Sequence, residues 1–256
     1  TNRGTIVTPL KDRIGSQILT HYPESIEIAK KITEQESKLD SKVISKIHIP
    51  EIARDIIEQI SFEARESELV DKKSGVSARM SITSLQNLVS SAERRMIINN
   101  EKKTSIRMSD FNSVISSING KVELVYEGEE EGAEQVSYNL ISDAVKSLFN
   151  KYFPKIEKLS KPGEETPYDS LLEWFTQKQL VIGDSLNDNE YEKLLLEIID
   201  ARTIIDKYVK DLDDNDRFFF IEFILWGLES FNKLSILRTN NGIEFKDPFN
   251  NFINKI

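Results

Sequence analysis

Arg13 is the first residue whose type and setting suit chemistry on a phosphate group. It stands in the stretch PLKDRIG, where Pro9 and Gly15 flank an Asp12-Arg13-Ile14 motif. An arginine guanidinium remains charged and presents a planar fork of donors that matches anionic groups such as phosphates and carboxylates. Isolated Asp-Arg pairs are common, and an ordinary surface arginine is the alternative interpretation.

Arg79 is the second such residue. It lies in the stretch SGVSARMSITSLQNLVSSAERR, where it begins a segment whose apolar residues recur with helical spacing. A guanidinium at the start of a helix can bind an anionic group, because it remains charged and offers several donors. A purely structural arginine at a helix start is the rival interpretation of this residue.

The chain lacks several other kinds of catalytic motif. A phosphate-binding loop needs Gly-x-x-x-x-Gly-Lys-Ser/Thr, but the one Gly-Lys pair, Gly120-Lys121, is followed by Val122 and has no earlier glycine in register. Cysteine is absent, which excludes disulfides and thiolate metal sites. The two histidines, His21 and His48, leave little material for a zinc site. We therefore expect no metal site and no complete ATP site within these residues.

An acidic stretch, DLDDNDRFFFIE, has the spacing of a calcium-binding loop. Asp211, Asp213, Asn215 and Glu222 occupy its first, third, fifth and twelfth positions. The sixth position of such a loop requires a sharp turn and favours glycine, but here it is Asp216. The alternative, which we favour, is an acid-rich start to a helix, where carboxylates interact well with the helix dipole.

Composition limits the class of protein. The 256 residues carry a formal charge of −9, with Lys and Arg scattered among the acids, which argues against a nucleic-acid-binding surface. The most apolar stretch, FFFIEFILWGLESF, is too short to cross a bilayer and contains two glutamates, so we expect no membrane association. The lack of cysteine and of a signal peptide favours a cytoplasmic location.

Helical spacing dominates the chain, so the predicted fold class is all-α. Stripes of apolar residues predict helices over roughly 51–60, 82–96, 136–149, 171–175, 191–208 and 219–231. Ser109 is predicted to cap a short helix that ends at Asn119-Gly120. Alternating residues predict short strands only at 121–126 and 242–247. A break that contains Pro and Gly is predicted at 160–169, between two helical clusters. The connection between the two clusters lies near residue 165.

Three segments resemble AAA+ ATPases of the magnesium chelatase ATPase-subunit and MoxR-like group. PLKDRIGSQILTHYP resembles the segment that carries the family's arginine finger, with Ile14 where Phe is common. SGVSARMSITSLQNLVSSAERR resembles the sensor-2 helix of the lid, with Arg79 at the arginine position. IRMSDFNSVISSINGKVEL is similar to the last lid helices. The resemblance covers nearly half of the chain.

The resemblance implies a domain organisation. Residues 1–23 correspond to a remnant of the AAA+ core with the arginine-finger segment, and residues 24–120 to the helical lid domain. Residues 121–160 form a long helix and connector, and residues 168–256 a C-terminal helical extension to which no family role carries over. The absence of an initiator methionine before Thr1 is interpreted as a trimmed fragment of a longer protein.

The resemblance also implies function. Arg13 would act in trans as the arginine finger at a neighbouring subunit's site, and Arg79 would contact the nucleotide phosphates as sensor 2. The full-length protein would use ATP and Mg²⁺ and form a ring of identical subunits. It would remodel a partner protein, often one with a von Willebrand-type domain in such motors, or drive metal insertion. This fragment alone would be inactive as an ATPase, because the phosphate loop and metal-binding acids are missing.

A different class of function is the alternative. The chain could be a stand-alone all-α adaptor whose aromatic-rich second half docks a partner helix or peptide. That interpretation requires exposed apolar surface at Phe219, Phe223, Trp226 and Phe231. Aromatic residues on helices more often pack in the core, so burial of these side chains would count against it.

Overall fold

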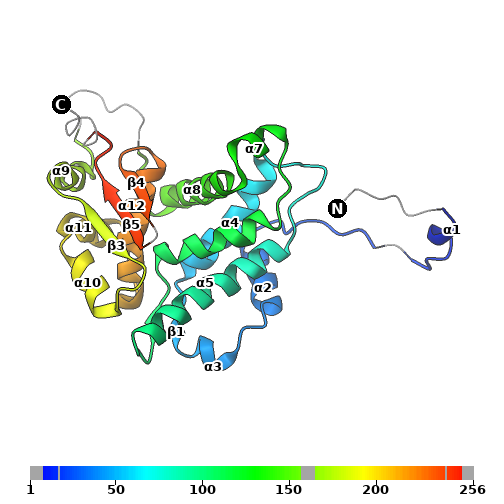
Figure 1. The fold of residues 1–256 in the computed structure, drawn as a ribbon, viewed down its shortest axis with the longest axis horizontal. Helices are drawn as coiled ribbons and strands as arrows, with labels where there is room; N and C mark the ends of the chain where they lie inside the picture. Colours follow the sequence, from blue (N-terminus) through cyan, green and yellow to red (C-terminus); the bar gives the residue numbers. More distant parts are fainter. Residues whose placement is uncertain (1–7, 17, 157–164, 240, 250–256) are drawn as a thin grey trace.

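The computed structural model describes residues 8–16, 18–156, 165–239 and 241–249. The protein is largely helical with a few short strands (Figure 1). In the first half of the chain the elements are α1 (Thr8–Lys11), α2 (Ile26–Glu36), α3 (Ser41–Ile44), β1 (Ile47–His48), α4 (Glu51–Glu66), α5 (Arg79–Ile98), β2 (Thr104–Ser105), the 3-10 helix η1 (Met108–Val114), α6 (Ile115–Asn119), α7 (Tyr126–Glu131) and α8 (Ala133–Tyr152).

The second half begins again after the connector. Its elements are α9 (Asp169–Gln177), β3 (Leu180–Gly183), α10 (Asp188–Leu196), α11 (Ile199–Tyr208), the 3-10 helix η2 (Asp214–Asp216), α12 (Arg217–Ser230), β4 (Ser235–Thr239) and β5 (Gly242–Lys246). Residues 160–164 of the predicted break at 160–169 lie outside the described part of the chain. Asp169, the last residue of that break, begins α9.

The helices α4 and α5 follow the predicted apolar stripes. α4 begins directly after Pro50, whose fixed φ is compatible with a helix start, and it buries its isoleucine stripe from Ile52 to Ile60. α5 begins at Arg79, as the sequence predicts, and buries the stripe from Leu85 to Met96. Both helices pack against one another, and α2 covers them (Figure 1). The three helices form the core of the first half.

The long helix α8 joins the two halves of the body. It packs along α4 and also along α12, and its predicted stripe from Val136 to Phe149 is buried throughout. The ring of Phe149 lies so close to Gly227 of α12 that a Cβ atom at Gly227 would be 2.1 Å from it. The glycine therefore permits the close approach of α8 and α12.

α12 is the central helix of the second half. Phe219, Phe223 and Trp226 are each at most 2% exposed, and Phe231 at the end of the helix is partly buried against the same core. These aromatic side chains therefore do not form the exposed docking surface that the adaptor alternative requires. Among the described helices, none, α12 included, is both long and apolar enough to span a membrane.

The structure corrects several predictions of local structure. The helix expected between Ser109 and Asn119-Gly120 forms as the 3-10 helix η1 followed by α6, which ends at Asn119 with Gly120 as its C-cap, as predicted. The N-cap of η1 is Arg107 and not Ser109, and the Asp110 carboxylate accepts a hydrogen bond from the backbone N–H of Arg107 at 2.8 Å. Within 121–126 only an isolated bridge forms, between Val70 and Leu124. The single helix expected over 191–208 is divided into α10 and α11 near Ile198.

The all-α prediction also missed most of the strands. β3, β5 and β4 form an antiparallel sheet in that order, in which Leu180 pairs with Phe245 and Ile236 pairs with the same residue from the other side. Of these strands only β5 was predicted. β1 and β2 pair in parallel, with His48 opposite Ser105. The sheet packs its Ile182 and Ile243 side chains into the core, so it completes the second half.

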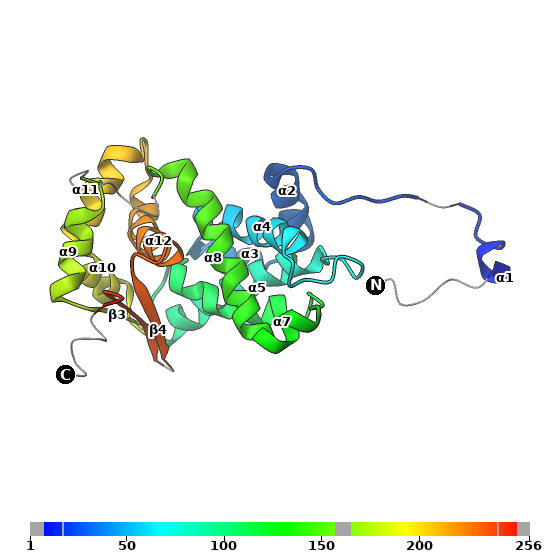
Figure 2. The same ribbon diagram turned by 90° about the horizontal axis from the view of Figure 1, so that it is seen from above.

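An N-terminal arm precedes the body. It comprises residues 8–16 and 18–24, which lead away from α2 and the other helices, with α1 at the far end (Figure 2). Several large apolar side chains on the arm are exposed, including Ile18 and Leu19, each 85% exposed. The predicted remnant of an AAA+ core, residues 1–23, corresponds to this arm, and its residues 1–7 and 17 lie outside the described part of the chain.

Candidate functional site

Arg79 lies at an open cleft between two loops of the first half. The first loop, residues 74–77, leads into α5, and the second, residues 119–123, follows α6. The cleft has a volume of about 710 Å³. Its lining residues are Tyr22, Ser74, Gly75, Val76, Ser77, Arg79, Asn119, Gly120, Lys121, Val122 and Glu123.

The first turn of α5 faces this cleft without a side-chain cap from its N-cap residue. Ala78 occupies the N-cap position and makes no side-chain hydrogen bond, while the backbone N–H of Arg79 donates to Ser77 Oγ at 3.3 Å. The Arg79 side chain is exposed. A helix N-terminus carries partial positive charge, so Arg79 adds a full charge where the helix dipole already favours an anion.

Tyr22 holds the loop before α5 in place. Its hydroxyl oxygen accepts a hydrogen bond from the backbone N–H of Val76 at 2.9 Å, and the Arg65 guanidinium lies over its ring at 4.2 Å. Gly75 has a φ of +70°, and a Cβ atom there would lie 2.5 Å from the Tyr22 hydroxyl. A side chain at position 75 would therefore strain the backbone and push against the tyrosine, so glycine is favoured there.

A polar cluster connects the two loops. The backbone N–H of Asp71 donates to the carbonyl of Glu123 at 2.8 Å, and the Ser74 hydroxyl contacts the carboxylates of both residues. The backbone N–H of Lys73 and the Ser74 hydroxyl stabilise the ionised Asp71 carboxylate and lower its pKa. The shape of the cleft is thus set by contacts that do not involve Arg79.

The two cationic side chains of the cleft are those of Arg79 and Lys121. Lys121 is half-buried on the second loop, directly after Gly120. Glu123 is the one acidic residue among the lining residues, and it is engaged by Ser74. This arrangement can hold a phosphate group or another compact anion through the Arg79 guanidinium and the Lys121 ammonium group.

Arg13 lies far from this cleft, in the turn that follows α1. Its side chain is exposed, and its backbone N–H donates to the carbonyl of Leu10 at 3.1 Å. Both views place α1 at the end of the arm, well separated from α5 (Figures 1 and 2). The structure therefore does not bring Arg13 and Arg79 together within one chain.

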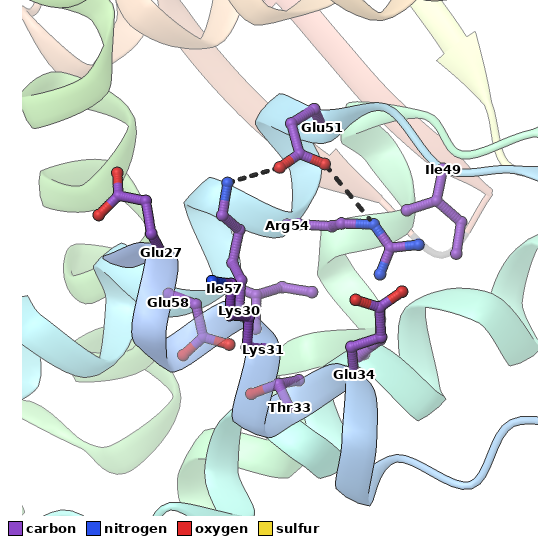
Figure 3. Close-up of a pocket in the computed structure, with 11 residues that line it drawn as sticks. Glu27, Lys30, Lys31, Thr33, Glu34, Ile49, Glu51, Arg54, Ile57 and Glu58 are labelled. Atoms are coloured by element: carbon purple, nitrogen blue, oxygen red, sulfur yellow. Dashed lines mark hydrogen bonds and ion pairs between the residues drawn. The ribbon is translucent and has the colours of Figure 1, made fainter. Parts of the chain in front are cut away.

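A second cleft, of about 550 Å³, lies between α2 and α4 (Figure 3). Lys30 of α2 reaches Glu51 and Asp55 of α4, with the Lys30 Nζ to Asp55 Oδ1 distance at 2.6 Å. Glu51 also lies 3.9 Å from Arg54. Glu58, 3% exposed, has a pKa raised by burial. Since the cations Lys30 and Arg54 already face these carboxylates, this cleft offers no clear preference for a charged ligand.

The acidic stretch from Asp211 to Glu222 does not form the calcium loop that its spacing allows. Glu222 is fully buried in α12 and accepts a hydrogen bond from the Tyr191 hydroxyl at 2.7 Å. It therefore cannot bind the same calcium ion as the exposed Asp213. Within the described ranges, no group of three or more His, Cys, Asp or Glu side chains is placed to hold a metal ion. The acids that were expected at the start of the long helix instead lie before it, in the 3-10 helix η2 and its N-cap Asp213, and the first turn of α12 contains no acidic residue.

Two features of the cleft are not identified from sequence. The residues around Gly120-Lys121 do not match a phosphate loop, and nothing in the sequence assigns a role to Tyr22. A weak signal is present, because Gly120 stands directly before Lys121 and Gly75 stands in the loop that leads to Arg79. Their convergence on Arg79 depends on tertiary packing.

The comparisons with known proteins return no relatives. No protein-family model matches the chain, and searches of curated proteins and of solved structures find no significant match.

Proposed function

We propose that this chain is the arginine-finger and lid portion of a ring-forming AAA+ ATPase of the magnesium chelatase ATPase-subunit or MoxR-like group. The observation that carries the proposal is the position of Arg79, which opens a long helix and is exposed on a cleft that also contains Lys121. The order of the motifs supports it, since the Asp12-Arg13-Ile14 turn precedes the helix of Arg79 as in the resembling family.

Each arginine has a distinct task in this proposal. When ATP and Mg²⁺ are bound, they supply the phosphoryl group and the metal that neutralises part of its charge. Arg79 holds the phosphates from the lid, and its position on α5 makes that contact sensitive to movement of the lid. Arg13 is exposed on the arm, where it is free to approach a nucleotide that is bound by a neighbouring subunit.

The partners follow from the same proposal. Identical subunits form the ring, because an arginine finger acts on the site of its neighbour. The work of ATP turnover is remodelling of a partner protein, as a chaperone does, or metal insertion, and a von Willebrand-type domain is the expected feature of the client. The phosphate loop and metal-binding acids come from residues beyond the 256 of this chain, so the described part is not expected to hydrolyse ATP alone.

An Arg13→Ala substitution in the full-length assembly tests this proposal. We expect ATP turnover to fall by about 10³-fold or more while nucleotide binding stays close to that of the unsubstituted protein, because a finger acts on the transition state. Lys11→Ala, which removes one positive charge from the same segment, is the matched control and should leave turnover within about twofold. Unchanged turnover in Arg13→Ala would show that the finger assignment is wrong.

A further inference from the structure

A buried polar network crosses the contact between the two halves of the helical body. One side belongs to α5 and to the residues around η1, and the other side belongs to α10 and α12. We call this contact the seam and define it by Arg95, Arg107, Asp110, Asp188, Tyr191 and Glu222.

The charged groups of the seam form a series in which each group contacts the next. Arg95 contacts Asp110, whose second carboxylate oxygen accepts the backbone N–H of Arg107 at 2.8 Å. The Arg107 guanidinium donates to Asp188 Oδ1 at 2.8 Å and lies over the Tyr191 ring at 4.0 Å. Arg107 therefore anchors the first half of the body to α10 through an ion pair and a cation–π contact.

Glu222 lies at the end of this chain of contacts. It is 0% exposed, and its Oε2 atom accepts a hydrogen bond from the Tyr191 hydroxyl at 2.7 Å. Its Oε1 atom has no hydrogen-bond partner among the described residues. Burial is the main cause that raises the pKa of Glu222 to about 7, and the Asp110 charge acts in the same direction. The Tyr191 hydroxyl, Arg107 and the backbone of Ser109 oppose that rise in pKa.

Other elements around α12 contribute few charges to Glu222. Asp206 of α11 pairs with Arg217, and Asp216 of η2 contacts His48 Nε2 at 2.6 Å, so both carboxylates are directed to other partners. α8 presents aromatic rings to α12, with Tyr152 against Phe220. Arg107 is the cation whose charge lowers the pKa of Glu222, and Asp188 already pairs with Arg107.

We propose that the buried Glu222 carboxyl is a protonation-dependent latch: the neutral carboxyl keeps the seam closed, and its ionisation loosens the contact between α10 and the residues around η1. An ionised carboxylate needs two or more donors or water, and in the closed seam one of its oxygens has none. Opening the seam on this side admits water. The apolar packing of α8 on α12 does not depend on charge, so the change is local and the two halves remain attached.

The test measures distance across the seam as a function of pH. The chain has no cysteine, so spin labels can be placed uniquely at Lys102→Cys, beside β2, and Lys193→Cys, on the exposed face of α10. From about pH 6 to about pH 8 the ionised fraction of Glu222 rises about tenfold, so the population of longer distances should rise by a similar factor. Labels at Lys72→Cys and Ser90→Cys, both on one side of the seam, should report no change.

Two substitutions make the test decisive. Glu222→Gln keeps the shape and the hydrogen bond from Tyr191 but cannot ionise, so it should abolish the pH response. Tyr191→Phe removes a hydrogen bond that favours the ionised carboxylate, so the midpoint of the response should move to higher pH. An unsubstituted protein without a pH response, or a response of equal size in Glu222→Gln, would overturn the proposal. The proposal would also be overturned if Tyr191→Phe did not move the midpoint of the pH response.

Discussion

The hydroxyl oxygen of Tyr22 accepts a hydrogen bond from the backbone N–H of Val76 at 2.9 Å, which ties the base of the N-terminal arm to the loop before α5. The Arg65 guanidinium covers the same ring, so the tyrosine is held from two sides. The arm that carries Arg13 and the cleft that contains Arg79 therefore share one anchor. In the proposed motor, this contact would transmit movement of the lid to the base of the arm.

Replacing Gly75 tests that anchor. Gly75→Ala places a Cβ atom 2.5 Å from the Tyr22 hydroxyl at a φ of +70°, so we expect the free energy of unfolding to fall by about 1–2 kcal/mol. Urea unfolding followed by circular dichroism measures this loss. Gly15→Ala is the matched control, because no atom lies within 4 Å of a Cβ atom added there and the substitution should change the stability little. Equal stability of both variants would contradict the account of the anchor.

Contact between α8 and α12 depends on Gly227. Gly227→Ala would bring a Cβ atom to 2.1 Å from the Phe149 ring, and we expect a loss of about 1–3 kcal/mol in unfolding free energy from overpacking. A second substitution, Phe149→Leu, removes the aromatic ring, including the Cε2 atom that a Cβ atom at Gly227 would approach to 2.3 Å. In a double-mutant cycle the effect of Gly227→Ala should therefore be smaller in the Phe149→Leu background. Additive losses would indicate that the two helices do not meet at this pair.

Sequence alone predicted the local helices well and their long-range contacts poorly. The periodic stripes of α4, α5 and α8 follow from short-range spacing and are confirmed. The start of α5 at Arg79 was expected from the family resemblance, and α5 begins at that residue. The sheet was mostly missed because β3 pairs with β5, and such distant pairing leaves little local signal in short strands. Lys121 joins Arg79 only through the fold, so this part of the cleft could not be predicted from spacing.

Binding of a polyphosphate tests the anion-holding character of the Arg79 cleft. On this chain we expect weak binding of inorganic triphosphate, and Arg79→Ala or Lys121→Ala should each weaken it by about tenfold, or ~1.4 kcal/mol. Nuclear magnetic resonance titration measures these affinities. Lys31→Ala, which removes one charge from the α2–α4 cleft, is the control for net charge. If Lys31→Ala weakens binding as much as the other two substitutions, the triphosphate is not held in the Arg79 cleft.

Stability should depend on pH through Glu222. Burial raises the pKa of this carboxyl from 4.5 to about 7, so the folded protein binds more protons than the unfolded chain between those values. The contribution of this group to the unfolding free energy is therefore highest below about pH 4.5. It decreases as the pH rises to about 7, by on the order of 3 kcal/mol at most.

Glu222→Gln isolates that contribution. Chemical unfolding at a series of pH values should give a flatter profile for the substituted protein across this window, because glutamine cannot titrate. Other carboxyl groups titrate in both proteins and cancel in the difference between the profiles. A difference that is independent of pH, or one of opposite sign, would show that the Glu222 carboxyl does not have a raised pKa.

The central claim is that Arg13 acts on a nucleotide bound by a neighbouring subunit. The most direct measurement is ATP turnover in mixed assemblies of the full-length protein, made from Arg13→Ala subunits and from subunits whose phosphate loop is inactivated. Each kind alone should be inactive. Mixing should restore turnover, because a subunit with an intact phosphate loop can then receive Arg13 from its neighbour. Mixed assemblies that stay as inactive as either parent would contradict the claim.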